Sequence, residues 1–214
     1  MNVVSIQKLV SRATLLLLAV LMAAGCSVLE PVVDRRRFYS LAGASGLAQF
    51  AAVAPAEAPT IGVRLTSAAS HLRQEAIAVR TGEHEVRFEA EHRWTEPPSE
   101  AFVRCLAGAM QRAAGSRLPV RVAPPLRSPS PAVLVEIDLL ACEGRRGAEN
   151  AALLVADWRI FKGREENPAA SGRFRVERDG WDGADFAQLT GLLSAAVEDL
   201  GGALGGPAIT IATQ

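Results

Sequence analysis

The chain has 214 residues, 49% of them hydrophobic, which fits one globular domain with short appendages. Its 23 basic and 23 acidic side chains balance and are mixed along the sequence. A nucleic-acid-binding protein is therefore not expected, because such a protein presents a basic surface to the phosphates. A wholly disordered chain is excluded as well, since the apolar fraction is ample for a core.

The first 25 residues have the profile of an export signal. Lys8 and Arg12 precede the ten-residue apolar run Leu15–Ala24, and no acidic residue lies before or within it. The run is too short to stay in a bilayer as a span, which takes about 20 apolar residues. We therefore predict that residues 1–25 are a signal peptide. Another feature is then needed to hold the mature chain at a membrane.

The end of the apolar run resembles the bacterial lipobox, in which small residues precede a cysteine that becomes the first mature residue. Ala24-Gly25-Cys26 carries the resemblance, although Ala23 stands where the usual pattern has Leu. The resemblance implies that Cys26 is acylated, and several acyl chains anchor a protein stably where one binds only marginally. Ser27 in place of Asp implies sorting to the outer membrane, facing the periplasm. An ordinary cleaved signal with an incidental cysteine is the alternative.

The mature chain is expected to begin with a tether. Residues 26–36 would hold the lipidated cysteine and a linker, and residues 37–214 would form a single domain. The segment Phe38–Leu41 is a short strand candidate. The stretch Gly43–Pro59 is rich in Ala, Gly and Pro without periodicity, which is typical of a surface loop.

From Thr60 onward, apolar and polar residues alternate with the period of two that half-buried strands show. The alternation predicts strands at 61–65, 77–80, 85–90, 133–139, 154–160 and 173–177. Thr81–His84 contains Gly82, which suits a tight connection, so the second and third strands are expected to form a hairpin. Gly144–Glu149 is expected to turn the fourth strand into the fifth.

Two later stretches repeat apolar residues at helical spacing. The stripes are Phe102, Cys105, Leu106, Ala109 and Ala113 in the first, and Phe186, Leu189, Leu193, Ala196 and Leu200 in the second. Pro97 is the expected N-cap and Pro98 the first helical residue. We expect the second helix to end at Gly201-Gly202. These elements predict an α+β fold in which two main helices pack on one face of an antiparallel sheet.

Several of these segments resemble the ABC-type transport auxiliary lipoproteins, a family that includes relatives of the paraquat-inducible protein C lipoprotein. In that family a lipobox and a strand with Phe-Tyr or Tyr-Tyr plus Leu precede the domain, and Arg-Trp-x-Glu-Pro closes a strand before the first long helix. The matching residues are Phe38, Tyr39 and Leu41 in the first motif and Arg93, Trp94, Glu96 and Pro97 in the second. The segment between Thr66 and Ala76 departs from the family pattern.

The resemblance implies a non-catalytic auxiliary component of an MCE-type lipid transport system. Its partners would be a periplasmic MCE protein with an inner-membrane permease and ATPase, while the lipoprotein attaches from the outer membrane. Neither the cargo nor a homo-oligomeric state is specified. One alternative is a structural or assembly lipoprotein that braces another envelope complex, and another is a small tethered hydrolase.

Candidate chemistry is sparse in the sequence. His71, His84 and His92 are the only histidines, and their spacing is not that of a compact metal site, so no metal and no cofactor is expected. The sequence contains no phosphate-binding Gly-x-x-x-x-Gly-Lys-Ser/Thr segment and no Gly-x-Ser-x-Gly nucleophile motif, which favours a protein that is not an enzyme. Glu96 and Trp94 are interpreted as structural residues.

Two cysteines besides Cys26 raise the question of a disulfide, because an exported protein meets an oxidising compartment. Cys105 lies on the apolar helical stripe, whereas alternation places Cys142 with Glu136 and Asp138 on the polar side of its strand. A bulge near Gly144 would reverse that parity. The sequence alone does not decide whether Cys105 and Cys142 form a disulfide.

Overall fold

The computed structural model describes residues 33–42, 59–115, 118–123 and 131–214. The expected signal segment, Cys26 and Ser27 lie outside these residues. The chain divides into the units 1–35 and 36–214, and every described helix and strand belongs to the second unit. Within the described ranges, no helix is at once long and apolar enough to cross a membrane.

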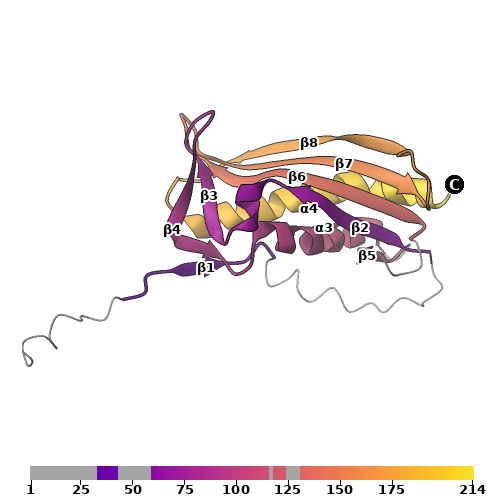
Figure 1. Ribbon diagram of the computed structural model, residues 1–214, viewed down its shortest axis with the longest axis horizontal. Helices are drawn as coiled ribbons and strands as arrows, with labels where there is room; N and C mark the ends of the chain where they lie inside the picture. The colour runs from indigo at the N-terminus through magenta and orange to yellow at the C-terminus, as the bar shows by residue number, and fades with distance from the viewer. Residues whose placement is uncertain (1–32, 43–58, 116–117, 124–130) are drawn as a thin grey trace, which may run out of the picture. The chain divides into compact units, whose positions relative to one another are not determined.

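Eight strands and two long helices make up the described fold (Figure 1). The strands are β1 (Arg37–Tyr39), β2 (Ile61–Ala68), β3 (Ala76–Arg80), β4 (Val86–Trp94), β5 (Val120–Val122), β6 (Val133–Arg145), β7 (Ala151–Lys162) and β8 (Ala170–Asp179). The helices are α3 (Pro98–Ala114) and α4 (Phe186–Ala212), with the short 3-10 helix η1 (Ser70–Arg73) between β2 and β3.

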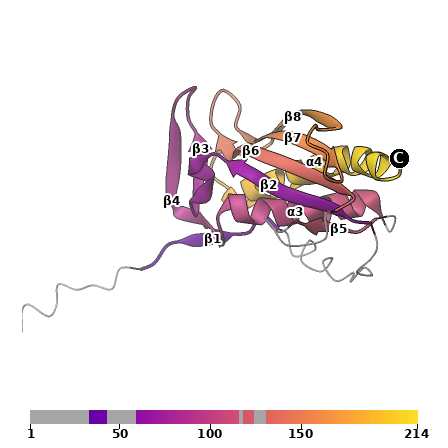
Figure 2. The same cartoon turned by 45° about the vertical axis from the view of Figure 1, so that its right-hand side comes forward.

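The sheet is organised around β6, which pairs on one side with β7 and on the other with β2 and β3. The ladders β6–β7, β7–β8 and β3–β4 are antiparallel, so the predicted hairpins are confirmed. The pairs β1–β4, β2–β5 and β2–β6 are parallel. Alternation does not predict this direction, because these strands pair with segments far away in the sequence. Both helices cover one face, and the α+β prediction is confirmed (Figures 1 and 2).

The core lies between the sheet and the two helices. Alternate residues of β6, from Val133 to Leu139, face it and are almost completely buried. Most of the predicted stripe residues face the core, among them Phe102 on α3 and Leu189 on α4, whereas Ala113 at the end of the first stripe is exposed. Each such side chain contributes roughly 1.5–3 kcal/mol on burial, which explains why both helices pack on the apolar face of the sheet. We call this face the helix side and the opposite face the open side.

A bulge in β6 changes which residues face the helices, from odd-numbered residues before the bulge to even-numbered residues after it. The register with β7 shifts between Leu139 and Ala141, so that Cys142 and Gly144 continue the core face begun by Ile137. Gly144 lies against α4, because a Cβ atom there would be 3.0 Å from a methyl group of Leu189. The bulge therefore supplies the reversal of parity that the sequence left open for Cys142.

The turn that follows β6 is shorter than predicted. Gly144 and Arg145 pair with Ala152 and Ala151, so β6 ends at Arg145 and β7 begins at Ala151. The expected turn at Gly144–Glu149 is thus wrong at its first two residues. The physical reason is that the ring of Trp181 occupies the space beside Gly144, within 2.8 Å of where a Cβ would lie. The glycine serves close packing in a strand, not a turn.

The second helix also departs from prediction, because α4 continues through Gly201-Gly202 to Ala212. Gly201 and Gly205 lie one turn apart against α3. A Cβ on Gly201 would overlap the Cβ of Ala109, and one on Gly205 would be 2.8 Å from the Cβ of Ala113. The helix starts as expected at Phe186, where the Asp185 carboxylate accepts hydrogen bonds from two amides of the first turn. These glycines allow the helices to approach closely and do not end α4.

This packing predicts opposite effects for two adjacent glycines. We expect Gly201→Ala to lower the free energy of unfolding by about 1–3 kcal/mol, because its methyl group meets α3. Gly202→Ala should raise it by about 0.5–1 kcal/mol, since no atom lies within 4 Å of the new Cβ and alanine is the better helix former. Urea unfolding of both variants measures the difference. Equal effects at the two positions would contradict the packing assigned to α4.

Candidate functional site

The two family-like motifs, which are far apart in the sequence, lie side by side in the structure. β1 pairs in parallel with the end of β4, with Phe38 opposite Arg93 and Tyr39 opposite Trp94. The amide of Thr95 donates a hydrogen bond of 2.7 Å to the carbonyl of Tyr39 and extends this ladder. The motifs therefore form one structural unit that attaches β1 to the domain.

The first motif is held by its side chains as well as its backbone. The hydroxyl of Tyr39 hydrogen-bonds Nδ1 of His92 at 2.9 Å, and the His92 ring stacks on Phe186 with 4.0 Å between centroids. Leu41 is buried in the core, and its carbonyl accepts a hydrogen bond of 2.5 Å from Ser194 of α4. Tyr39 and Leu41 thus fix β1 to both the sheet and α4.

The second motif supports the corner between β4 and α3. Trp94 is fully buried in the core, and Pro97 is the N-cap of α3, as predicted. Glu96 forms an ion pair with Arg104 of α3. Arg93 lies 3.8 Å from the carboxylate of Glu75. Each side chain has a structural partner, which supports the interpretation of this motif as part of the fold.

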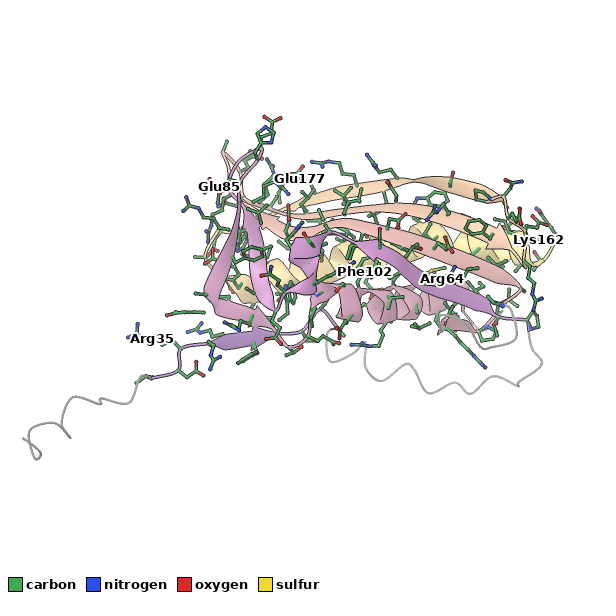
Figure 3. The ribbon with its side chains drawn as sticks, in the orientation of Figure 1. Arg35, Arg64, Glu85, Phe102, Lys162 and Glu177 are labelled. Carbon is green, nitrogen blue, oxygen red and sulfur yellow. The ribbon has the colours of Figure 1, made fainter. Side chains whose placement is uncertain are left out.

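The open side of the sheet carries a connected set of charged side chains from β2, β6, β7 and β8, with Arg64 and Glu177 labelled in Figure 3. Glu136 pairs with Arg64 of β2 and with Arg159 of β7. Arg159 also donates a hydrogen bond of 3.1 Å to Asp138, which accepts a second one from Ser67. We call Arg64, Ser67, Glu136, Asp138, Asp157, Arg159 and Arg173 the outer-face network.

The network resolves an unfavourable arrangement of like charges. Asp138 and Asp157 are direct partners in the β6–β7 register, which by itself would be destabilising. Arg173 donates two hydrogen bonds to Asp157, at 2.6 and 2.8 Å. These hydrogen bonds lower the pKa of Asp157, and the same contact raises the pKa of Arg173. Asp157 thus favours its ionised form on a face that helices do not cover.

A buried acid that alternation places wrongly lies where β2 gives way to β3. Glu143 is fully buried, yet it accepts a hydrogen bond of 2.6 Å from Arg80 and contacts Nε2 of His71 at 2.8 Å. The ladder of β2 ends at Leu139 and that of β3 begins at Gly144, so Glu143 lies at the gap between them. Unbroken alternation from Val133 would place Glu143 on the helix side, whereas the bulge moves it to the open side, where it is buried at this gap.

The two cysteines are free thiols in the structure. Burial raises the pKa of Cys105 to about 11 and that of Cys142 to about 12. Thiolates, not thiols, are the reactive form, so both groups are protonated at neutral pH. Neither cysteine therefore has the properties of a nucleophile.

Within the described residues, no group of three or more His, Cys, Asp or Glu side chains could hold a metal ion. The carboxylates of the outer-face network are engaged by arginines or by Ser67, which suits recognition of a charged partner better than proton transfer. The arrangement supports a binding surface.

The thiols provide a direct chemical test. In a chain whose Cys26 is lipidated or replaced, we expect a thiol reagent at pH 8 to label neither Cys105 nor Cys142 rapidly, because about one thiol in a thousand or fewer is ionised. After unfolding in denaturant without reductant, both should react, and two thiols per chain should be counted. Recovery of thiols only after reduction would show that the two cysteines are bonded.

Comparisons with known proteins agree with this architecture. The structure of XCC0632 from Xanthomonas campestris is 17% identical and superposes with a TM-score of 0.61, covering 74% of this chain and 90% of that one. An uncharacterised protein of known structure is 12% identical, with a TM-score of 0.61 and coverage of 80% and 97%. At these identities the likeness concerns the fold alone. No curated protein gave a significant match.

A family model extends the comparison beyond the fold. The model of the ABC-type transport auxiliary lipoprotein component matches residues 39–204, most of the chain. The match begins at Tyr39 of β1 and includes the complete Arg93–Pro97 motif, β6 with its bulge and most of α4. The chain therefore belongs to the family of ABC-type transport auxiliary lipoprotein components.

Proposed function

We propose that this lipoprotein is a non-catalytic auxiliary component of an MCE-type lipid transport system, anchored in the outer membrane and facing the periplasm. Family membership supports a role beside an ABC transport system. The observation that carries the docking role is the outer-face network, which presents charged side chains on the side of the sheet opposite α3 and α4. We infer that a periplasmic MCE protein, acting with its inner-membrane permease and ATPase, binds there.

The exposure of the network supports this assignment. The Arg173 side chain is 63% exposed and that of Arg159 is 40% exposed, although both are already oriented by carboxylates. Such pre-positioned charges contribute to specificity and to the rate of association more than to raw affinity. A partner with complementary charges could replace solvent on this face without rearrangement of the core.

The N-terminal anchor supplies the other half of the proposal. Residues 1–25 would be removed as a signal peptide, Cys26 would carry the acyl chains, and residues 27–36 would lead to β1 in the domain 37–214. The pairing of β1 with β4 then fixes the point at which the tether joins the domain. A lipoprotein that braces another envelope complex would share this anchor, so the identity of the bound partner separates the two functions.

The anchor makes a prediction for labelling. Metabolic incorporation of a fatty acid should mark the wild-type chain and not Cys26→Ser, because the sulfur and the new amine are the sites of acylation. Ser27→Asp should keep the label but move the protein from the outer-membrane to the inner-membrane fraction. Equal labelling of wild type and Cys26→Ser would disprove lipidation at Cys26. Identical fractionation of wild type and Ser27→Asp would disprove the sorting role of Ser27.

The docking role makes a second prediction. In the full-length lipoprotein, Arg64→Glu with Arg159→Glu should reduce co-purification of the MCE protein about tenfold or more, because two positions on the face change sign. The melting temperature should fall, because Glu136 loses both arginine partners and each new carboxylate lies beside an existing one, so recovery is measured well below the melting temperature of the variant.

The matched control is Arg87→Glu with Arg104→Glu, which makes the same change in charge at two exposed pairs on β4 and α3. Full recovery of the partner is expected with this control. Equal recovery with both double variants would reject the outer-face network as the docking site. Capture of a different envelope complex in place of the MCE protein would favour the bracing function.

A further inference from the structure

The outer edge of β8 is a long stretch of backbone with which no described strand pairs. β8 spans ten residues, pairs with β7 along one edge and ends the sheet on that side (Figure 1). An unpaired edge of this length is a template for another strand, since its outward amides and carbonyls lack ladder partners. The question is which strand would fit.

The side chains of β8 are divided between the two faces of the sheet. Arg173, Arg175, Glu177 and Asp179 point to the open side, where Arg173 meets Asp157 and Glu177 meets Arg145. Phe174, Val176 and Arg178 point to the helix side, where Val176 packs on the core and Arg178 pairs with Asp199 of α4. The open-side row therefore reads basic, basic, acidic, acidic along the strand.

A second copy of the same strand is complementary to this row. When two copies of β8 run antiparallel about a twofold axis perpendicular to the sheet, opposite residues lie on the same face. If Val176 faces Val176 of the partner subunit, then Arg175 faces Glu177 of the partner subunit and Arg173 faces Asp179 of the partner subunit. Each pair occurs twice, and cross-strand pairs of opposite charge are stabilising.

Neighbouring registers do not have this property. A shift of one step toward the N-terminus places Arg175 opposite itself, and a shift of one step toward the C-terminus places Glu177 opposite itself. Like charges directly opposite one another are destabilising. On the helix side, the Val176 register also brings Phe174 opposite Arg178 of the partner subunit, a combination suited to a cation–π contact. The charge pattern thus selects one register.

We propose that the protein forms a twofold homodimer in which β8 pairs antiparallel with β8 of a second copy, centred on Val176. Within one chain Arg173 pairs with Asp157, Arg175 with Glu177 and Glu177 with Arg145. These contacts hold the side chains on the open face and leave the backbone edge of β8 unpaired by any described strand. The dimer joins the two sheets and leaves Arg64 and Arg159 clear of the new ladder. It rests on the β8 edge and not on the partner proposed above, and Arg173 is the one residue that belongs both to the new ladder and to the outer-face network.

A charge-swap experiment tests the register in full-length lipoprotein. Chain one carries Arg173→Glu and Arg175→Glu, and chain two carries Glu177→Arg and Asp179→Arg. Each chain is co-expressed with a differently tagged copy of itself, or the two are co-expressed together. Capture of one tag by the other should fall about tenfold or more for each variant with itself, because four favourable pairs become repulsive. Co-expression of chain one with chain two should restore capture to well above that of either variant with itself, because every pair between the subunits is again of opposite charge.

Cysteine cross-linking gives an independent measurement. Under oxidising conditions Val176→Cys should produce a disulfide-linked dimer, since the two introduced thiols face each other across the axis. Ser171→Cys, on the same strand and exposed, should produce none, because it lies five residues from the centre. Failure of the mixed charge-swap chains to associate, or equal cross-linking at both positions, would overturn the proposal. Wild-type chains that do not capture each other would overturn it as well.

Discussion

The pairing of three residues in β1 with the end of β4 is the constraint on which the proposed architecture of this lipoprotein depends. It connects the segment that follows Cys26 to the domain, at a point where Trp94 and Leu41 belong to the core. A strand of three residues contributes few hydrogen bonds, and it is retained because Tyr39, Leu41 and Trp94 each make further contacts with His92, α4 or the core. The family-like motifs are explained as the two sides of this attachment.

The bulge in β6 has a comparable influence on the remainder of the domain. By shifting the register after Leu139, it places Cys142 and Gly144 against the helices and Glu143 on the opposite side. The gap between the ladders of β2 and β3 occurs at the same point, where Arg80 and His71 supply the hydrogen bonds that a buried carboxylate requires. The one-residue bulge thus keeps the apolar residues of β6 on the helix side and its charged residues on the open side.

The sequence predicts those features that depend on local periodicity. The antiparallel hairpins, the stripes of both helices and the N-cap at Pro97 follow from spacing and from proline geometry, and the structure confirms them. The predicted end of α4 is wrong because Gly201 serves contact with α3. The position of Glu143 on the open side is not predicted, because a bulge leaves no pattern in a single sequence. The outer-face network is predicted only as a polar side. Which arginine meets which acid depends on the registers of β2, β7 and β8.

The most direct test of the account is native-state hydrogen exchange at the amide of Thr95, which donates to the carbonyl of Tyr39. If β1 is firmly attached to β4, this amide should exchange only through large-scale opening, with protection close to that of core amides in β6. Removal of the Tyr39 hydroxyl by Tyr39→Phe should lower the protection of Thr95 at least as much as that of the β6 amides, because every opening that exposes Thr95 breaks the contact with His92. Exchange of Thr95 in the wild-type protein at the rate of an unstructured peptide would contradict the attachment of β1.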